Sequence, residues 1–359
     1  MLKAAIVGAT GIVGQQFIVA LKNHPWIEIV ALAASEKSVN SSYRKAITDT
    51  QSGALRWFCK EAPIEEIMDL PVQNATDLST GGIDIVFSAV DSGPAKILEP
   101  LYAATTPVIS TASAFRYEKD VPIIIPGINP EHMQLLKVQQ QSRGWKGFIA
   151  PQPNCTTVGL AISLKPILQE YGLNSVIMTS MQAISGAGRS PGVLGIDIID
   201  NIIPYIPGEE EKVQLETQKI LGSFSGHSID PATFKISSTC TRVNVRDGHT
   251  ESVFFSTQKP CNVVGVIKAM REFSGSFVKS ELPSVPQNMI IVRDDPFRPQ
   301  PRLDCDADNG MATVVGRIRE DDVLENGIKY ILVSHNTKMG AARGAVLTAE
   351  VLIQSGYIS

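Results

Sequence analysis

The sequence lacks the features that mark a membrane protein or a nucleic-acid-binding protein. No stretch of its 359 residues approaches the roughly 20 consecutive apolar residues of a membrane span. The N-terminal apolar run is interrupted by Gly8 and Gly11, so we expect no signal peptide there. Lys and Arg number 32 against 36 Asp and Glu, and this balance predicts neither a nucleic-acid partner nor a membrane partner. We find no internal repeat and no low-complexity tract.

Cysteine is also scarce. The chain has an odd number of cysteines and no CxxC pair; they are Cys59, Cys155, Cys240, Cys261 and Cys305. This pattern argues against a disulfide framework and against a zinc site, so we expect no bound metal. Unpaired cysteines favour a reducing compartment, and we expect the protein in the cytoplasm.

The length and composition are ordinary for a soluble globular enzyme. Apolar residues make up 43% of the chain and charged residues 19%, with a net charge of −4. A chain of 359 residues exceeds what one hydrophobic core usually serves, so we expect two domains.

The first residues read as a dinucleotide-binding unit. A buried strand (2–7) precedes the turn GATGIVG (8–14), a helical run (15–23) and a second strand (27–35). Gly8 permits a tight turn, Gly11 lets the backbone approach a pyrophosphate, and Gly14 permits close packing of helix and strand. The helix N-terminus then faces the phosphates. Because the spacing is GxxGxxG, a purely structural glycine turn is the alternative.

The end of the second strand favours NADP over NAD. Ser35, Lys37 and Ser38 are compatible with a 2′-phosphate, whereas the single carboxylate of Glu36 suits a free ribose hydroxyl. Runs at 83–90 and 106–111 read as the fourth and fifth strands of the same parallel sheet.

Ser88 lies at the predicted carboxyl end of the run 83–90, where cofactors bind in such sheets. As an alternative, it is a small residue that closes a turn.

Cys155 lies between a predicted strand (147–150) and a predicted helix (156–172), at or just before the N-terminus of the helix. The helix dipole and unpaired backbone N–H groups at such a position lower the pKa of a thiol. The alternative is that Cys155 is a small buried hydrophobe.

The second half reads as an α+β domain with a mixed, largely antiparallel sheet, because several strand-like runs follow one another. The predicted strands are 175–185, 234–245, 249–257, 289–294, 312–320 and 328–336, with helices at 210–222 and 261–273. A final Ala-rich helix (339–357) is expected to pack back on the first domain. The Gly-rich loop 185–195 reads as flexible or cofactor-facing.

Polar residues in otherwise ordinary segments offer a site for a charged amino acid. Arg242 suits a carboxylate, and His249 is a natural general base for a thiol. Glu209 and Lys212 share one face of a helix start. Taken singly, these residues equally suit a solvated surface. Gln182 in an apolar strand and Arg116 after a strand complete the set.

Six motifs in order then identify a resemblance. GATGIVG, PNCTT, QAISGAG, EEEK, TRVNVRDGH and HNTKMGAARG follow one another as in aspartate-semialdehyde dehydrogenases, especially the archaeal and fungal branch. The resemblance covers essentially the whole chain. It implies an α/β fold with a Rossmann-like NADP-binding domain over 1–154, a catalytic and dimerisation domain over 155–336, and a C-terminal helix (337–359) that packs on the first.

The resemblance further implies NADPH-dependent conversion of aspartyl β-phosphate into aspartate semialdehyde and phosphate, in the biosynthesis of lysine, threonine and methionine. It makes Cys155 the nucleophile and His249 the acid and base. The thiolate is the reactive form of cysteine, and a neighbouring imidazolium of His249 stabilises it. Gln182 orients the reacting centre, Arg242 holds the α-carboxylate and Glu209 the ammonium. Phosphate contacts are implied for Lys212, Arg116 and Asn154. Cofactor contacts are implied for Thr10, Gly11, Ile12, Val13, Ser35, Lys37, Ser38, Ser185, Gly186 and Asn336.

Three positions depart from the family pattern: Thr111 replaces a common asparagine, Lys37 a common arginine, and Gly127 a larger residue. The main rivals share the fold, namely acetylglutamyl-phosphate and malonyl-CoA reductases. These enzymes do not need an acidic residue three positions before Lys212 to bind a free ammonium group. A non-catalytic NADP sensor needs no nucleophile such as Cys155. The resemblance implies a homodimer or a homotetramer.

Overall fold

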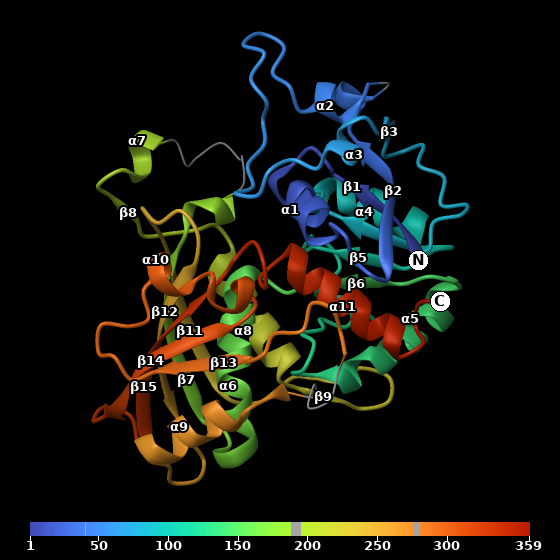
Figure 1. The fold of residues 1–359 in the computed structure, drawn as a ribbon. Coiled ribbons are helices and arrows are strands. Elements are labelled where there is room, and N and C mark those ends of the chain that lie inside the picture. Colours follow the sequence, from blue (N-terminus) through green and yellow to red (C-terminus); the bar gives the residue numbers. More distant parts are fainter. Residues whose placement is uncertain (40, 188–194, 276–280) are drawn as a thin grey trace.

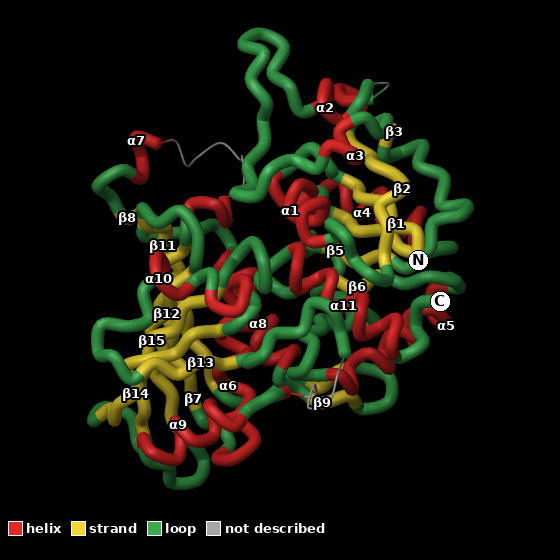
Figure 2. Tube along the Cα trace, in the orientation of Figure 1, coloured by secondary structure: helices red, strands yellow, loops and turns green. Residues whose placement is uncertain are grey.

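The computed structural model describes residues 1–39, 41–187, 195–275 and 281–359, and within these it contains two large sheets and one two-stranded sheet (Figures 1 and 2). The first is wholly parallel, in the order β3-β2-β1-β4-β5-β6. Its strands are β1 (Leu2–Val7), β2 (Ile27–Ala34), β3 (Val72–Asn74), β4 (Ile85–Ser88), β5 (Val108–Ser110) and β6 (Ile149–Pro151).

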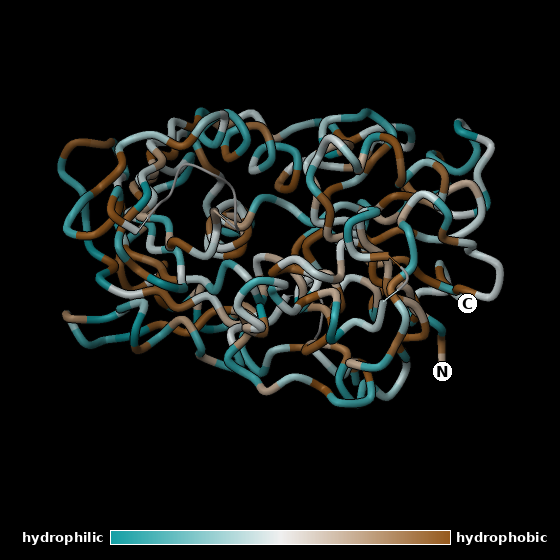
Figure 3. The backbone as a smooth tube through the Cα atoms, turned by 90° about the horizontal axis from the view of Figure 1, so that it is seen from above, coloured by the Kyte–Doolittle hydropathy of each residue, from teal (hydrophilic) through white to brown (hydrophobic). Residues whose placement is uncertain are grey.

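Helices cover both faces of this sheet. Alternate residues of β1 enter different cores: Ala4 and Ile6 pack with residues of α1 (Ile12–Ala20) and α11 (Ala342–Gln354), and Val7 packs with residues of α4 (Ser92–Ala103). The C-terminal helix therefore packs on the first sheet, and Figures 1 and 3 place the two chain ends side by side. Further short elements are η1 (Glu36–Ser38), α2 (Tyr43–Ala46), α3 (Glu65–Met68), η2 (Pro130–Gln134) and α5 (Leu135–Arg143).

The second sheet is mixed, in the order β13-β14-β15-β12-β7-β11-β8. The pairs β7–β11 and β13–β14 are parallel, and the other neighbours are antiparallel. Its strands are β7 (Ser175–Gln182), β8 (Ile202–Ile203), β11 (Lys235–Val243), β12 (His249–Ser256), β13 (Ile290–Arg293), β14 (Thr313–Asp321) and β15 (Gly327–Ser334). This arrangement confirms the predicted fold class.

Three helices pack on one face of the second sheet: α6 (Cys155–Tyr171), α8 (Glu209–Ile220) and α9 (Val263–Glu272). The opposite face is at least partly exposed, since Ile177 in the middle of β7 is 46% exposed. The remaining elements are η3 (Ile184–Ala187), α7 (Gly195–Ile198), β9 (Ser223–Phe224), β10 (Ile229–Asp230), α10 (Pro301–Asp304) and η5 (Ala307–Gly310).

The predicted elements correspond to observed ones, with shifted ends. The helix expected from residue 15 begins at Ile12, and the short strands β3, β8, β9 and β10 have no counterpart among the predictions. Of the Gly-rich loop 185–195, residues 188–194 lie outside the described residues. In the described parts of the chain, no helix has the length and apolarity needed to cross a membrane.

The glycine at position 127, one of the departures from the family pattern, has a structural reason. Its backbone has a φ of 85°, which favours glycine. A Cβ on Gly275 would lie 3.1 Å from the Cα of Gly127, so two glycine segments meet closely there.

Candidate active site

Cys155 lies at the start of α6, held there by the residue before it. Asn154 is the N-cap, and its side-chain oxygen accepts hydrogen bonds from the amides of Thr156 (2.9 Å) and Thr157 (3.3 Å). Residues 156–164 of α6 are all buried, and Gly159 packs so closely that a Cβ there would lie 2.8 Å from Ser334 Cβ. The half-buried thiol is therefore fixed by both the cap and the core.

His249, the first residue of β12, brings its ring to this thiol. The distance from Cys155 Sγ to His249 Nε2 is 3.1 Å. The other ring nitrogen, Nδ1, accepts a hydrogen bond of 3.0 Å from the backbone amide of Ala183. A nitrogen that accepts cannot also carry a proton, so the neutral ring has its proton on Nε2, directed at the sulfur.

Burial shifts both groups toward their neutral forms. It raises the pKa of the Cys155 thiol to about 12, with help from the negative charge of Glu209 and against Arg242, Arg116 and the Thr156 amide. Burial, followed by the charge of Arg242, lowers the pKa of His249 to about 3. Desolvation outweighs the helix N-terminus in this site, so the thiol pKa is shifted upward and not downward as the sequence led us to expect, and the same burial opposes an imidazolium–thiolate pair.

Arg242 and Gln182 lie side by side because they are register partners on β11 and β7. Arg242 donates from Nη1 to the carbonyl of Ala183 (2.9 Å) and to Gln182 Oε1 (3.4 Å). A Cβ on Gly186 would lie 3.0 Å from both Arg242 Nη1 and His249 Cε1, so glycine leaves this space open. Both buried side chains thus face the surroundings of the thiol.

Glu209 enters from the first turn of α8. Its Oε1 accepts hydrogen bonds from Asn154 Nδ2 (2.8 Å) and Gln182 Nε2 (3.3 Å), while Oε2 has a longer contact with Lys212 Nζ (3.5 Å). The structure therefore brings together Glu209, Lys212, Asn154 and Gln182, as the sequence predicted.

Arg116 joins the site through a residue that the sequence analysis did not single out. Its Nη1 lies 3.0 Å from Oε1 of the buried Glu216, and its Nη2 donates to the carbonyl of Thr111 (3.0 Å). Glu216 stands seven residues after Glu209, two helical turns along one face, and this spacing was the signal that could have found it. Thr111 also donates its hydroxyl to the Ser88 carbonyl, so this departure from the family pattern is structural.

The glycine turn leaves its helix end open. Gly8 has a φ of 81°, and a Cβ on Gly14 would lie 2.3 Å from the Gly8 carbonyl oxygen, so both positions require glycine. Gly11 is the N-cap of α1 and has no side chain to cap the first amides. Ile12 and Val13 then form the first turn, and Thr10 precedes them. These amides can receive a pyrophosphate.

Ser88 lies at the predicted place in the first sheet, but its side chain is buried. It ends β4 at the carboxyl edge, paired with Val7 of β1, as expected. Its side chain, however, is wholly buried and donates to Glu99 Oε1 (2.7 Å). A cofactor contact at this position would therefore come only from the backbone.

The other predicted cofactor residues fall into two groups. Ser35 and Lys37 are exposed around η1 and Ser38 is half-buried, after the end of β2. Asn336 follows β15; it accepts from the Gly248 amide (2.9 Å) and donates to Ser185 Oγ (2.8 Å). Asn336 and Ser185 therefore lie on the His249 side of the molecule, next to Gly186.

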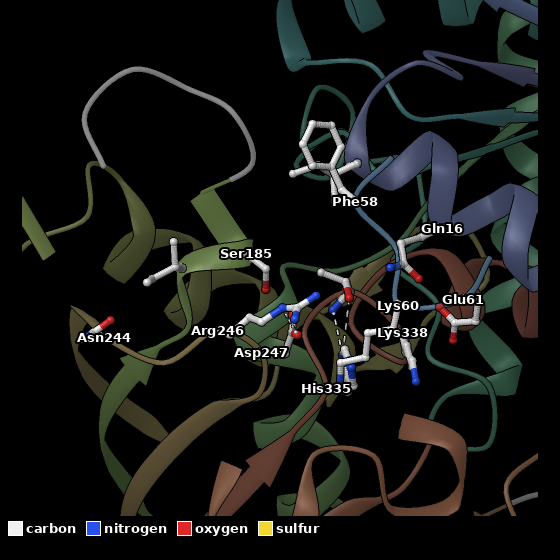
Figure 4. A pocket seen from close by; sticks show the side chains of 13 residues that line it. Gln16, Phe58, Lys60, Glu61, Ser185, Asn244, Arg246, Asp247, His335 and Lys338 are labelled. Atoms are coloured by element: carbon white, nitrogen blue, oxygen red, sulfur yellow. Dashed lines mark hydrogen bonds and ion pairs between the residues drawn. The ribbon is translucent and has the colours of Figure 1, made fainter. Parts of the chain in front are cut away.

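A cavity of about 430 Å³ lies beside the second group, and Ser185 lines it (Figure 4). Its lining combines Ile12 and Gln16 of α1 with Ser185, and with the cationic side chains Lys60, Arg246 and Lys338. The fold thus leaves an open space that runs from the glycine turn toward the segment beside Gly186.

An ion-pair cluster borders this cavity. Asp306 lies 2.9 Å from Lys60 Nζ and 2.8 Å from Lys338 Nζ. The side-chain atoms of Cys305, Asp306 and His335 that could bind a metal ion lie within 4.8 Å of one another. Because two ammonium groups already neutralise the carboxylate, we interpret the cluster as a link between the two halves of the chain.

Comparison with known proteins shows a consistent similarity. The family model described as "Semialdehyde dehydrogenase, NAD binding domain" matches residues 3–136, and "Semialdehyde dehydrogenase, dimerisation domain" matches residues 164–339. Aspartate-semialdehyde dehydrogenases of Archaeoglobus fulgidus and Methanothermobacter thermautotrophicus are 46% and 43% identical, over 98% of this chain and 98% and 99% of theirs. The crystal structure of the Candida albicans enzyme with NADP has a TM-score of 0.88 and 40% identity, covering 100% of both chains.

Proposed function

The chain belongs to the aspartate-semialdehyde dehydrogenase family, and from this premise we propose that it reduces L-aspartyl-4-phosphate to aspartate semialdehyde through a thioester on Cys155. The observation that carries the proposal is the 3.1 Å contact between Cys155 Sγ and His249 Nε2, set among Arg242, Arg116 and Glu209. These groups offer a nucleophile, a proton donor and charges opposite to each ionic group of the substrate.

We propose that Arg242 and Glu209 hold the amino-acid part of the substrate. Among the described residues Arg242 is engaged only through Nη1, so the rest of its guanidinium is available for the α-carboxylate. Within the described part of the chain, the Glu209 Oε2 atom has only its long contact with Lys212, so it can accept from the ammonium. Gln182, hydrogen-bonded to both, orients them.

The phosphate is assigned to Arg116 and Lys212, with Asn154 beside them. Because burial raises the pKa of Cys155 and so favours its thiol form, the thiol proton needs an acceptor when the sulfur attacks the acyl phosphate. We propose that the departing phosphate takes this proton: the C–S bond forms, the C–O bond to phosphate breaks, and hydrogen phosphate leaves. In this scheme His249 acts as a donor through Nε2–H and not as the base.

The glycine turn fits NADP, because α1 has an uncapped N-terminus and Gly14 keeps that turn close to the strand. Gly8, Thr10, Gly11, Ile12 and Val13 would hold the pyrophosphate. Bound NADPH supplies the hydride that reduces the thioester. The Nε2–H group of His249 then stabilises the sulfur as a thiolate while the C–S bond breaks, and a proton from solvent restores the thiol. The phosphate-compatible set Ser35, Lys37 and Ser38 would hold the 2′-phosphate, and Ser185, Gly186 and Asn336 the nicotinamide end.

We further propose the division of the chain into an NADP-binding domain (1–154) and a catalytic and dimerisation domain (155–336). The partly exposed outer face of the second sheet supports a homodimer or a homotetramer, since one copy of such a face can pack on another. We propose a cytoplasmic location and a role in lysine, threonine and methionine biosynthesis.

The test is NADPH absorbance with aspartate semialdehyde, NADP and phosphate, each omitted in turn, beside a Cys155→Ser variant. We expect a signal that needs all three and disappears in the variant. If NADP binds but no signal appears, the substrate assignment is wrong, and acetylglutamyl and acyl-CoA substrates would be tested next.

A further inference from the structure

Glu216 is a buried carboxylate that contacts three residues from two segments of the active site. It lies on α8 and is 0% exposed. Its Oε1 accepts hydrogen bonds from Arg116 Nη1 (3.0 Å) and from the Tyr117 hydroxyl (3.0 Å). Its Oε2 accepts one of 2.6 Å from the backbone amide of Asn154. One side chain therefore joins the segment after β5 to the junction between β6 and α6.

Arg116 depends on this carboxylate for its orientation. Besides Glu216, its guanidinium has one other hydrogen-bond partner in the parts of the chain that the structure describes, the Thr111 carbonyl, 3.0 Å from Nη2. Its Nε is buried and has no hydrogen-bond partner among the described residues. A planar guanidinium held at both ends presents its remaining donors in a fixed direction, and that direction matters for a phosphate.

The same carboxylate fixes the residue before the nucleophile. Asn154 is held at three points: its amide donates to Glu216, its side-chain oxygen caps α6, and its Nδ2 donates to Glu209. Any shift of Glu216 would therefore move Arg116 and the start of the helix that carries Cys155 together.

We propose that Glu216 is a positioning residue that sets Arg116 for phosphate and ties it to the backbone of Cys155. This inference rests on the proposed function, because it takes phosphate as the ligand of Arg116. It is distinct from the roles of Glu209 and Lys212, which lie on the same helix face two turns and one turn earlier, respectively.

The test compares Glu216→Gln with Glu211→Gln, assayed with aspartate semialdehyde, NADP and inorganic phosphate. Glutamine fills the same space and still accepts from the Asn154 amide, but its NH₂ group then faces another donor at Arg116. We expect the KM for phosphate to rise about 100-fold, as for a small misplacement of a binding group. The KM for the semialdehyde should stay within about twofold, because Arg242 and Glu209 are untouched. Exposed Glu211 makes the same charge change on the same helix and should leave both constants unchanged.

A double-mutant cycle with Arg116→Gln guards against a simple loss of folding, since it removes the buried charge along with its partner. If Glu216 acts through Arg116, adding Glu216→Gln to that background changes the phosphate KM by less than about twofold. The inference is overturned if Glu216→Gln leaves the phosphate KM unchanged or if both KM values rise alike. It is also overturned if the phosphate KM of the double variant rises by the full product of the two single fold-changes. A wild-type enzyme without phosphate-dependent NADPH formation would instead refute the proposed function itself.

Discussion

The thiol of Cys155 in the ligand-free enzyme is expected to react with iodoacetamide at a rate that climbs about tenfold per pH unit from about pH 6 to pH 9. Thiolate is the reactive form, and a pKa of about 12 against the ordinary 9.0 makes it about a thousandfold scarcer at neutral pH. His249 has a pKa of about 3, so its charge does not change over this range.

Two substitutions should shift the thiol pKa of Cys155 in opposite directions. The negative charge of Glu209 opposes ionisation of Cys155, so Glu209→Gln should lower the thiol pKa and speed alkylation at a given pH. The positive charge of Arg242 favours ionisation, so Arg242→Gln should raise the pKa and slow the reaction. A free thiol such as N-acetylcysteine corrects for the reagent itself.

The assay is alkylation at several pH values, with the Cys155 peptide quantified by mass spectrometry. A rate that reaches a plateau with a midpoint near neutral pH would refute the reasoning, because it would show an imidazolium–thiolate pair. Slower alkylation of Glu209→Gln would refute the assigned cause.

Further substitutions test the cofactor half. Gly14→Ala should destabilise the fold by about 1–3 kcal/mol in thermal unfolding, because its Cβ would lie 2.3 Å from the Gly8 carbonyl oxygen. Its matched control Gly93→Ala, in α4 with nothing within 4 Å, should be neutral or slightly stabilising; equal effects would contradict the close packing. Lys37→Glu should raise the KM for NADP about tenfold with little change for NAD, through loss of a charged contact to the 2′-phosphate. If the KM for NAD rose by the same factor, Lys37 would not be a contact of the 2′-phosphate.

Much of the fold followed from local pattern. The longer strands of the first sheet are largely apolar runs bounded by polar or glycine segments, whereas β12 of the second sheet alternates, and this alternation places His249 and Val253 on the inner face. The Gly8–Gly14 turn required glycines for reasons visible in sequence. The order of motifs predicted the family, and the comparisons confirmed it.

The electrostatics of the site could not be predicted in this way. Placement of Cys155 at a helix start was right, but its pKa depends on burial beneath other elements, which no local pattern reveals. The proton on His249 is set by the Ala183 amide, 66 residues away in sequence. Glu216 meets Arg116 across 100 residues. Such contacts arise only when the helices and the two sheets pack together.

The thioester on Cys155 is the central claim, and the most direct measurement supplies semialdehyde and NADP without phosphate. The account predicts a burst of about one NADPH per active site followed by a stop, with one aspartyl acyl group on the Cys155 peptide in the mass spectrum. Added phosphate should then release the acyl group and restart turnover. No burst and no adduct, or steady turnover without phosphate, would contradict it.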